Sequence, residues 1–224
     1  MTYMDTESKT FYKSLIRIVG PIALQNLIAA AVNSADVVML GAVGQTAIAA
    51  SSLASNVGFI QLMVCTGLSS GLVMLGTQYW GKKDIESIKT LIGIALRIVL
   101  VVGLIFGLSA IFIPELLMKL FTNEEQLITT GCMYLRAVGI SYIFFSISQM
   151  LQAGFKSIER VKIVTISSTS TLFLNIGLNA VFIFGLFGMP KLGIMGVGIA
   201  TSISRFVEFV FCLIYAYKQK DMNF

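Results

Sequence analysis

The chain has 224 residues, of which 56% are hydrophobic and 12% are charged, and its mean hydropathy of +0.87 excludes an ordinary soluble domain in favour of a polytopic membrane protein. The sequence contains no histidine, which excludes imidazole-based catalysis and most designs of zinc site. Its net charge is +5, but the basic residues stand in short segments between apolar runs, and this pattern favours membrane orientation over nucleic-acid binding.

Six apolar stretches follow one another along the chain, at residues 18–42, 47–79, 91–113, 127–155, 163–187 and 193–217. Each is long enough to cross a hydrocarbon core of about 30 Å as a helix, which takes about 20 residues. None has the alternating pattern of a barrel strand. We therefore predict an all-α bundle of six transmembrane helices at 18–217. A cytoplasmic segment at 1–17 precedes it, and a cytoplasmic tail or the start of a linker at 218–224 follows it.

Lysine and arginine are distributed unevenly between the two sets of loops. Eleven stand before the first span, in every second loop or after the last span: Lys9, Lys13, Arg17, Lys82, Lys83, Lys89, Lys156, Arg160, Lys162, Lys218 and Lys220. The other loops carry Lys119 and Lys191. Because positively charged loops stay on the cytoplasmic side, this asymmetry predicts that both termini are cytoplasmic. We expect an integral protein of a bacterial or archaeal cytoplasmic membrane, surrounded by lipid.

The first span contains Asp36, the one charged residue between Arg17 and Lys82. A carboxylate inside a membrane is costly unless it faces a partner, an ion or water, so Asp36 is a candidate functional residue. Gln25 and Asn33 precede it at helical spacing, which places the three side chains on one stripe of the helix.

Polar residues of the fifth and sixth spans are expected near Asp36. Asn175 and Asn179 are four residues apart and share a helix face. With a rise of about 1.5 Å per residue, Asp36 lies about 28 Å above Arg17, Asn179 about 25 Å above Lys162, and Thr201 about 15 Å below Lys191. These depths let Asp36 and Asn179 meet in the outer half of the membrane, which Thr201 enters from outside. Their carboxylate, amide and hydroxyl oxygens would suit a proton, Na⁺ or a cationic ligand.

A structural interpretation of the same polar residues stands beside the functional one. Asparagine, serine and threonine inside membranes often hydrogen-bond neighbouring helices, and the hydroxyls of residues 165–171 fit that role or bond the preceding helical turn. The cysteines Cys65, Cys132 and Cys212 lie far apart in apolar runs, which is typical of inert buried thiols.

The remaining charged residues within or next to the spans have local explanations. Arg97 and Arg136 are expected to snorkel or to pair, whereas Arg205 is deeper and is expected to face protein or water. The acidic segment with Glu115, Glu124 and Glu125 is interpreted as an exterior helix end and loop, with a helix cap at Thr122 or Asn123.

Several short motifs together resemble the multidrug and toxic compound extrusion (MATE) transporters. They are GPIALQN at 20–26, NSAD at 33–36, LG at 40–41, AIAA at 47–50, GLSSG at 67–71, Gln78, Gly81, YLR at 134–136, NIGLN at 175–179, FG at 184–185 and LGIMGVGIAT at 192–201. Each motif is short, but their order and their places on the spans make the set fairly specific. The resemblance covers essentially the whole chain.

This resemblance implies an efflux antiporter rather than an enzyme, built from two pseudo-symmetric six-helix lobes. Such a transporter exports organic cations or other xenobiotics in exchange for Na⁺ or H⁺, with no cofactor beyond that coupling ion. Asp36 matches the acid of the first helix, and Asn175 and Thr201 match other members of the cation-binding group, where Na⁺ would bind. Gln25, Asn33, Gln78 and Arg205 are then candidates for lining the cavity.

Two departures from the family pattern stand out. Some subfamilies carry an aspartate at the position of Asn179, and losing that carboxylate halves the fixed negative charge of the site. A family member also has about twelve spans, whereas six are predicted here, which matches an N-terminal lobe. We therefore expect a second six-helix lobe or a homodimer partner, and we expect that this chain alone does not transport.

Two other functional classes compete with this interpretation. A flippase for lipid-linked oligosaccharides, from the same broad superfamily, would line its cavity with several cationic residues, and Arg97, Arg136 and Arg205 are the available ones. A six-span membrane enzyme would need polar groups clustered near a cytoplasmic face, such as paired aspartates that bind a metal. The single deep aspartate and the missing histidines argue against such an enzyme.

Overall fold

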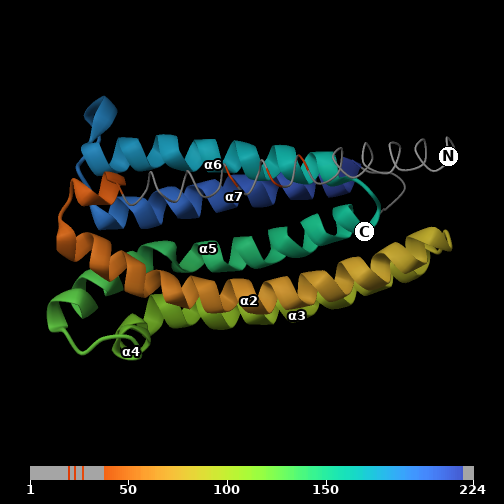
Figure 1. Cartoon of the computed structure of the whole chain (residues 1–224), viewed down its shortest axis with the longest axis horizontal. Helices are drawn as coiled ribbons and strands as arrows, with labels where there is room; N and C mark the ends of the chain where they lie inside the picture. The colour runs from red at the N-terminus through yellow and green to blue at the C-terminus, as the bar shows by residue number, and fades with distance from the viewer. Residues whose placement is uncertain (1–19, 21–22, 24–26, 28–37, 219–224) are drawn as a thin grey trace, which may run out of the picture.

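The computed structural model describes residues 20, 23, 27 and 38–218 of the chain. The elements of this part are α2 (Gln45–Gly81), α3 (Ile85–Phe112), α4 (Pro114–Lys119), α5 (Glu125–Ser157), α6 (Val161–Phe184), the 3₁₀ turn η1 (Leu186–Gly188) and α7 (Ile194–Lys218). Five of the described helices are long and apolar enough to span a membrane: α2, α3, α5, α6 and α7. The prediction of an all-α membrane bundle is thus confirmed, and Figure 1 shows these long helices side by side. Most of the first predicted span lies outside the described residues.

Gly185 ends α6 earlier than the apolar run suggested, at Phe184 instead of residue 187. Its φ of +71° lies in the left-handed region, which favours glycine and commonly terminates a helix. A Cβ on Gly185 would also come within 2.8 Å of the Met189 carbonyl oxygen. The chain then makes the turn η1, with Phe187 93% exposed, before α7 begins.

The segment between α3 and α5 differs in detail from the predicted exterior loop. Residues 114–119 form the short helix α4. Pro114 fits its first turn, where the N–H that proline lacks would have no partner within the helix. The cap of α5 is Glu124 rather than Thr122 or Asn123, and the Thr122 hydroxyl instead accepts a hydrogen bond from the Glu124 N–H at 3.2 Å. Glu125 lies in the first turn of α5, as predicted.

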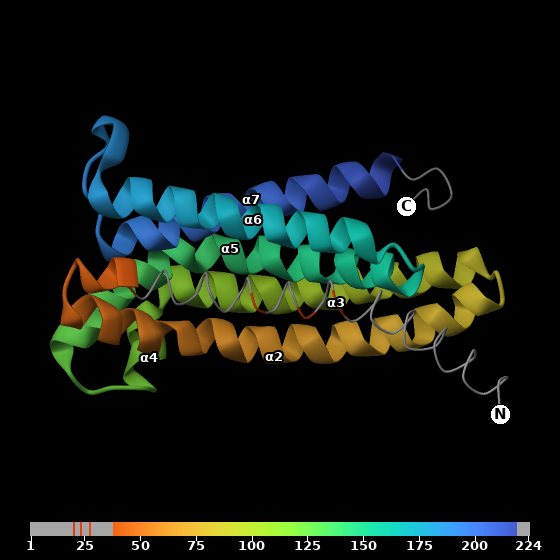
Figure 2. The same ribbon diagram turned by 45° about the horizontal axis from the view of Figure 1, so that its top comes forward.

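Helix α5 is the central element of the bundle, since α2, α3 and α7 all pack against it and α6 packs against α7. Figure 2 shows α5 between the α2–α3 pair and the α6–α7 pair. Small residues let α5 and α7 approach closely: a Cβ on Gly198 would lie 2.6 Å from the Cβ of Ala137. The Ser202 hydroxyl adds a 2.7 Å hydrogen bond to the Ala137 carbonyl oxygen. This crossing positions the polar residues of α7.

The helix ends separate the basic residues as the loop pattern predicted. The turns at 82–84 and 157–160 and the end of α7 lie at one end of the bundle, whereas the segments at 41–44, 113–124 and 185–193 lie at the other (Figure 1). The first end carries the described members of the basic group, and the second carries Lys119 and Lys191. Many large apolar side chains on the outer surface of the helices are exposed, as a lipid environment allows.

Candidate functional site

Asn175, Asn179 and Thr201 form one hydrogen-bonded group between α6 and α7. The Asn179 amide donates to the Asn175 side-chain oxygen at 3.2 Å, and the Asn175 amide donates to the Thr201 hydroxyl at 3.4 Å. Asn179 is fully buried. The structure thus brings these three predicted site residues together. Asp36, Gln25 and Asn33, the other members of the predicted site, lie outside the described residues.

Beside this group, an open pocket of about 500 Å³ lies among α2, α5 and α7. It is lined mainly by small, aromatic and polar side chains, among them Asn56, Phe59, Gln61, Tyr142, Thr201 and Arg205. Aromatic walls with a few placed polar groups are typical of sites for organic ligands. Thr201 belongs to both features, so the asparagine group and the pocket share a side chain.

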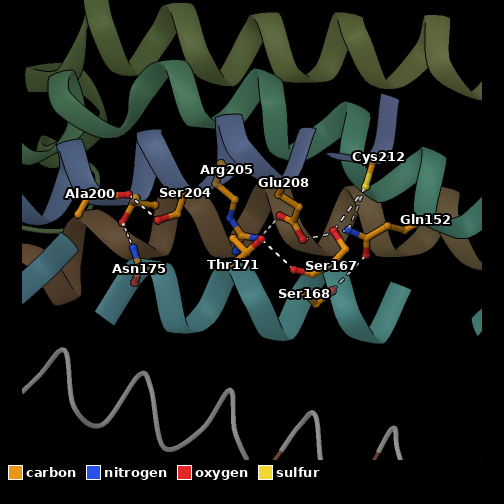
Figure 3. Close-up of polar contacts among 11 residues, drawn as sticks. Gln152, Ser167, Ser168, Thr171, Asn175, Ala200, Ser204, Arg205, Glu208 and Cys212 are labelled. Atoms are coloured by element: carbon orange, nitrogen blue, oxygen red, sulfur yellow. Dashed lines mark hydrogen bonds and ion pairs between the residues drawn. The ribbon is translucent and has the colours of Figure 1, made fainter. Parts of the chain in front are cut away.

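A buried ion pair follows one turn further along α7. Arg205 donates to the carboxylate of Glu208 at 2.8 Å, with Glu208 3% exposed and Arg205 35% exposed. The other carboxylate oxygen of Glu208 accepts a 2.9 Å hydrogen bond from the Gln152 amide on α5. Figure 3 shows these side chains from α5 and α7 pointing toward one another beside α6.

Sequence reasoning identified Arg205 but missed Glu208. Arg205 does line the pocket, as predicted for a deep arginine. Glu208 stands in an apolar run three residues after Arg205, and this spacing puts an acid and a base on the same helix face. That i, i+3 pattern within a span was the signal available for finding the pair.

Helix α6 supplies hydroxyl groups around the pair. Ser168 donates to the side-chain oxygen of Gln152 at 3.4 Å, and the Cys212 sulfur lies 3.8 Å from both the Gln152 nitrogen and the Ser167 oxygen. Thr171 bonds its own helix, through the Ser167 carbonyl oxygen at 2.9 Å. The polar contacts therefore continue along the α6–α7 interface from the asparagine group toward the basic end of the bundle (Figure 3).

Gln61 is a second polar residue that sequence reasoning missed. It is fully buried, and its amide nitrogen donates to the Tyr142 carbonyl oxygen and to the Ser146 hydroxyl, both at 2.7 Å. These bonds join α2 to α5 at the wall of the pocket. Its side-chain oxygen has no hydrogen-bond partner among the described residues.

Gln78 was predicted to line the cavity, and it is not among the residues that line the pocket described above. Gln78 is exposed near the end of α2, where its carbonyl oxygen accepts a hydrogen bond from the Lys82 N–H. It lies seventeen residues beyond Gln61 on the same helix, or about 25 Å at the helical rise, so it does not reach the pocket that Gln61 lines.

Comparison with known proteins places this geometry in a family. A family model described as MatE matches residues 21–181, most of the chain. The chain belongs to the MatE family. The resemblance drawn from the motifs is thereby confirmed, and with its five long apolar helices the chain is an integral membrane protein.

The curated relatives are multidrug resistance proteins. The chain is 28% identical over 204 residues to NorM of Vibrio parahaemolyticus, covering 90% of this chain and 44% of NorM. It is 27% identical over 215 residues to the probable multidrug resistance protein YoeA of Bacillus subtilis, covering 93% of this chain and 45% of YoeA. It is 25% identical over 206 residues to PmpM of Pseudomonas aeruginosa, covering 92% and 43%. The chain thus spans about half the length of the curated relatives it matches.

Solved structures show the same fold. The chain resembles an outward-facing multidrug resistance MATE family transporter with a TM-score of 0.84 at 18% identity, covering 94% of this chain and 46% of that one. It resembles a MOP superfamily transporter from Pyrococcus furiosus with a TM-score of 0.83, also at 18% identity and with the same coverage.

Proposed function

We propose that the chain acts as one lobe of a multidrug efflux antiporter that exports organic cations in exchange for Na⁺ or H⁺. Its membership of the MatE family and the multidrug resistance names of its relatives support this assignment. The lobe works with a second six-helix lobe, supplied by another polypeptide segment or by a second copy, because alternating access requires two units that move against each other.

The position of Thr201 carries the proposal. Its hydroxyl accepts the hydrogen bond from Asn175, and Thr201 also lines the pocket. A coupling ion bound by the asparagine group and a ligand in the pocket would therefore both contact Thr201. Binding of one would change the affinity for the other. Exchange of one cation for another needs such a connection, since two independent sites would not couple.

The coupling ion would bind the oxygens of Asn175, Asn179 and Thr201 together with the carboxylate of Asp36. Amide carbonyl and hydroxyl oxygens are hard ligands that suit Na⁺, and Asp36 adds the negative charge that either Na⁺ or a proton requires. With an asparagine at 179, one carboxylate carries this charge, so Asp36 is the residue on which coupling depends most.

A flippase is the second candidate, and the pocket disfavours it. Such a protein would bind anionic head groups with several cationic side chains. Of the described residues that line the pocket, Arg205 alone is basic, and Glu208 neutralises it. Arg136 lines a separate hollow near Glu115 and Glu125, and Arg97 is exposed on α3.

Ligand binding by the purified chain in lipid nanodiscs tests the proposal, with ethidium as a fluorescent organic cation. Thr201→Val keeps the side-chain shape and removes one neutral hydrogen bond, worth about 1 kcal/mol, so ethidium should bind roughly fivefold more weakly. Thr165→Val is the matched control, because Thr165 bonds its own helix at Val161. Asp36→Asn should abolish the effect of Na⁺ on ethidium affinity and reduce the effect of acid. Wild-type chain that binds no ethidium, or binds it independently of both ions, would contradict the proposal.

A further inference from the structure

Glu208 is a buried carboxylate that the proposed coupling group does not include. It stands on α7, seven residues beyond Thr201, and is 3% exposed. Both carboxylate oxygens have partners, Arg205 on one and Gln152 on the other. A carboxylate at this depth in a membrane is costly, and ionisable groups are usually retained there for ion or proton movement.

Arg205 connects this carboxylate to the pocket. Its guanidinium pairs with Glu208 and lies 4.8 Å from the centre of the Phe145 ring, and Arg205 and Phe145 both line the pocket. The arginine is one-third exposed while the acid is buried, so the positive member of the pair meets the pocket and the negative member lies behind it. A ligand in the pocket therefore experiences the charge of Arg205, reduced by whatever charge Glu208 carries.

The groups around Glu208 are mostly neutral. Among the described groups that contact Glu208 or Gln152 or line the pocket, the ionisable or charged ones are Arg205 and Cys212 on α7 and Tyr134 and Tyr142 on α5. The α6 side contributes the hydroxyls of Ser167, Ser168 and Thr171, and the α2 wall contributes the amides of Asn56 and Gln61. Within this part of the chain, Arg205 is thus the charge that pairs with Glu208.

We propose that Glu208 is a proton-binding site whose protonation, acting through Arg205, expels an organic cation from the pocket. The inference rests on the proposed function, because it assumes that an organic cation occupies this pocket. It assigns to α7 a second ion-exchange carboxylate, separate from the group of Asn175, Asn179 and Thr201.

The exchange follows from charge. With Glu208 ionised, the pair is neutral overall, and an organic cation can occupy the pocket against the aromatic side chains. When Glu208 takes a proton, Arg205 is left with an uncompensated positive charge on the pocket wall, and this charge repels a cation in the pocket. By linkage, the bound cation must weaken proton binding at Glu208 by the same factor.

The surroundings can hold Glu208 in both forms. Gln152 has an amide donor and an amide acceptor, and its oxygen is engaged by the Ser168 hydroxyl at the long distance of 3.4 Å. The ionised carboxylate accepts from the Gln152 nitrogen, and a protonated carboxyl can donate to the Gln152 oxygen after the amide rotates. In both states the carboxyl group of Glu208 therefore keeps a hydrogen bond to Gln152, as exchange at this site requires.

Ethidium binding to the full chain in nanodiscs, from mildly acidic to mildly alkaline pH, tests the proposal with three variants. Glu208→Gln imitates the protonated acid and should weaken ethidium binding about tenfold at alkaline pH. Glu208→Gln combined with Arg205→Gln removes both charges and should restore the affinity. Glu86→Gln, on the exposed start of α3, is the control and should bind as the wild type does. A purely structural ion pair predicts that the double variant binds no better than the single one, and that result would overturn the proposal.

Infrared spectroscopy separates this proposal from the proposed function, because it needs no ligand. The wild type should gain a protonated-carboxyl band as the pH falls, and this band should be missing in Glu208→Gln but present in Asp36→Asn. Wild-type chain that shows the band but binds no organic cation would refute the transport assignment and support the proton site. A spectrum of Glu208→Gln that titrates as the wild type does would refute the proton site.

Discussion

The side chain of Gln152 on α5 donates a 2.9 Å hydrogen bond to the carboxylate of Glu208 on α7, across a separation of 56 residues in sequence. The bond lies in the buried interface between these two helices, where both residues are almost fully covered. It satisfies the carboxylate oxygen that Arg205 does not reach. The contact therefore ties the central helix of the bundle to the helix that carries both the ion pair and Thr201.

Replacing Gln152 by leucine should destabilise the protein by about 1–3 kcal/mol, because one oxygen of the buried Glu208 loses its donor. Gln149→Leu is a suitable control, since Gln149 is half-buried on the same helix and makes no side-chain hydrogen bond with the described residues. The measurement is thermal unfolding of both variants in detergent. Equal unfolding temperatures for the two would show that the Gln152–Glu208 bond contributes nothing.

Gly198→Ala should open the contact between α5 and α7. The new Cβ would lie 2.6 Å from the Ala137 Cβ and 3.1 Å from the Tyr134 carbonyl oxygen, so the helices must separate, at a cost of about 1–3 kcal/mol. Gly177→Ala on α6 is the matched control, because a Cβ there meets nothing within 4 Å. Alanine is the better helix former, so the control should be as stable as the wild type or slightly more stable. Comparable losses of thermal stability in both variants would contradict the packing argument.

Single cysteines at the two ends of the bundle should be labelled from opposite sides of the membrane. Lys82→Cys and Arg160→Cys are expected to react from the cytoplasmic side, whereas Asn123→Cys and Met189→Cys should react from outside. All four positions are exposed, and the native thiols of Cys65, Cys132 and Cys212 are buried, so background labelling should be low. An impermeant maleimide applied to intact cells makes the distinction, and detergent should expose all four positions. If only Lys82→Cys and Arg160→Cys reacted in intact cells, the orientation would be the opposite of the predicted one.

Asp84 should make the stability of the start of α3 depend on pH. Its carboxylate accepts hydrogen bonds from the Ser87 hydroxyl at 2.6 Å and from the Ser87 N–H at 3.1 Å, and these bonds hold the pKa of Asp84 below its ordinary value of 3.8. A carboxyl with a lowered pKa in the folded state stabilises that state above the unfolded pKa, and this contribution is lost as the pH falls through the folded value.

Asp84→Asn should therefore lower the unfolding temperature at neutral pH, and its difference from the wild type should disappear once the pH is well below 3.8. Ser170→Ala, at an exposed position on α6, provides a reference without a titrating group. A difference between wild type and Asp84→Asn that stays constant down to strongly acidic pH would show that the charge of Asp84 is not involved.

Features that depend on local sequence were predictable. Long apolar runs identify spanning helices because the hydrocarbon core demands about 20 apolar residues in a row, and the four such runs from 91 onward match α3, α5, α6 and α7 closely. The spacing of Asn175 and Asn179 was enough to place both on one face, since helical geometry is the same in any protein. The helical rise placed Thr201 about 15 Å below Lys191, and the three side chains do meet.

Contacts that depend on how the helices rotate against one another were decided by the tertiary structure. Gln61 and Gln78 are both glutamines on α2, yet one is fully buried at the pocket and the other is exposed near the helix end, because Gln61 lies on the face of α2 that meets α5 and Gln78 lies on another face. Glu208 was readable as a partner of Arg205 from spacing alone, but its bond to Gln152 and its place behind the pocket wall depend on the packing of α5 against α7. Hydrophobicity places each helix in the membrane whatever its rotation, whereas packing of small residues such as Gly198 selects the faces that meet, and so selects which polar side chains become neighbours.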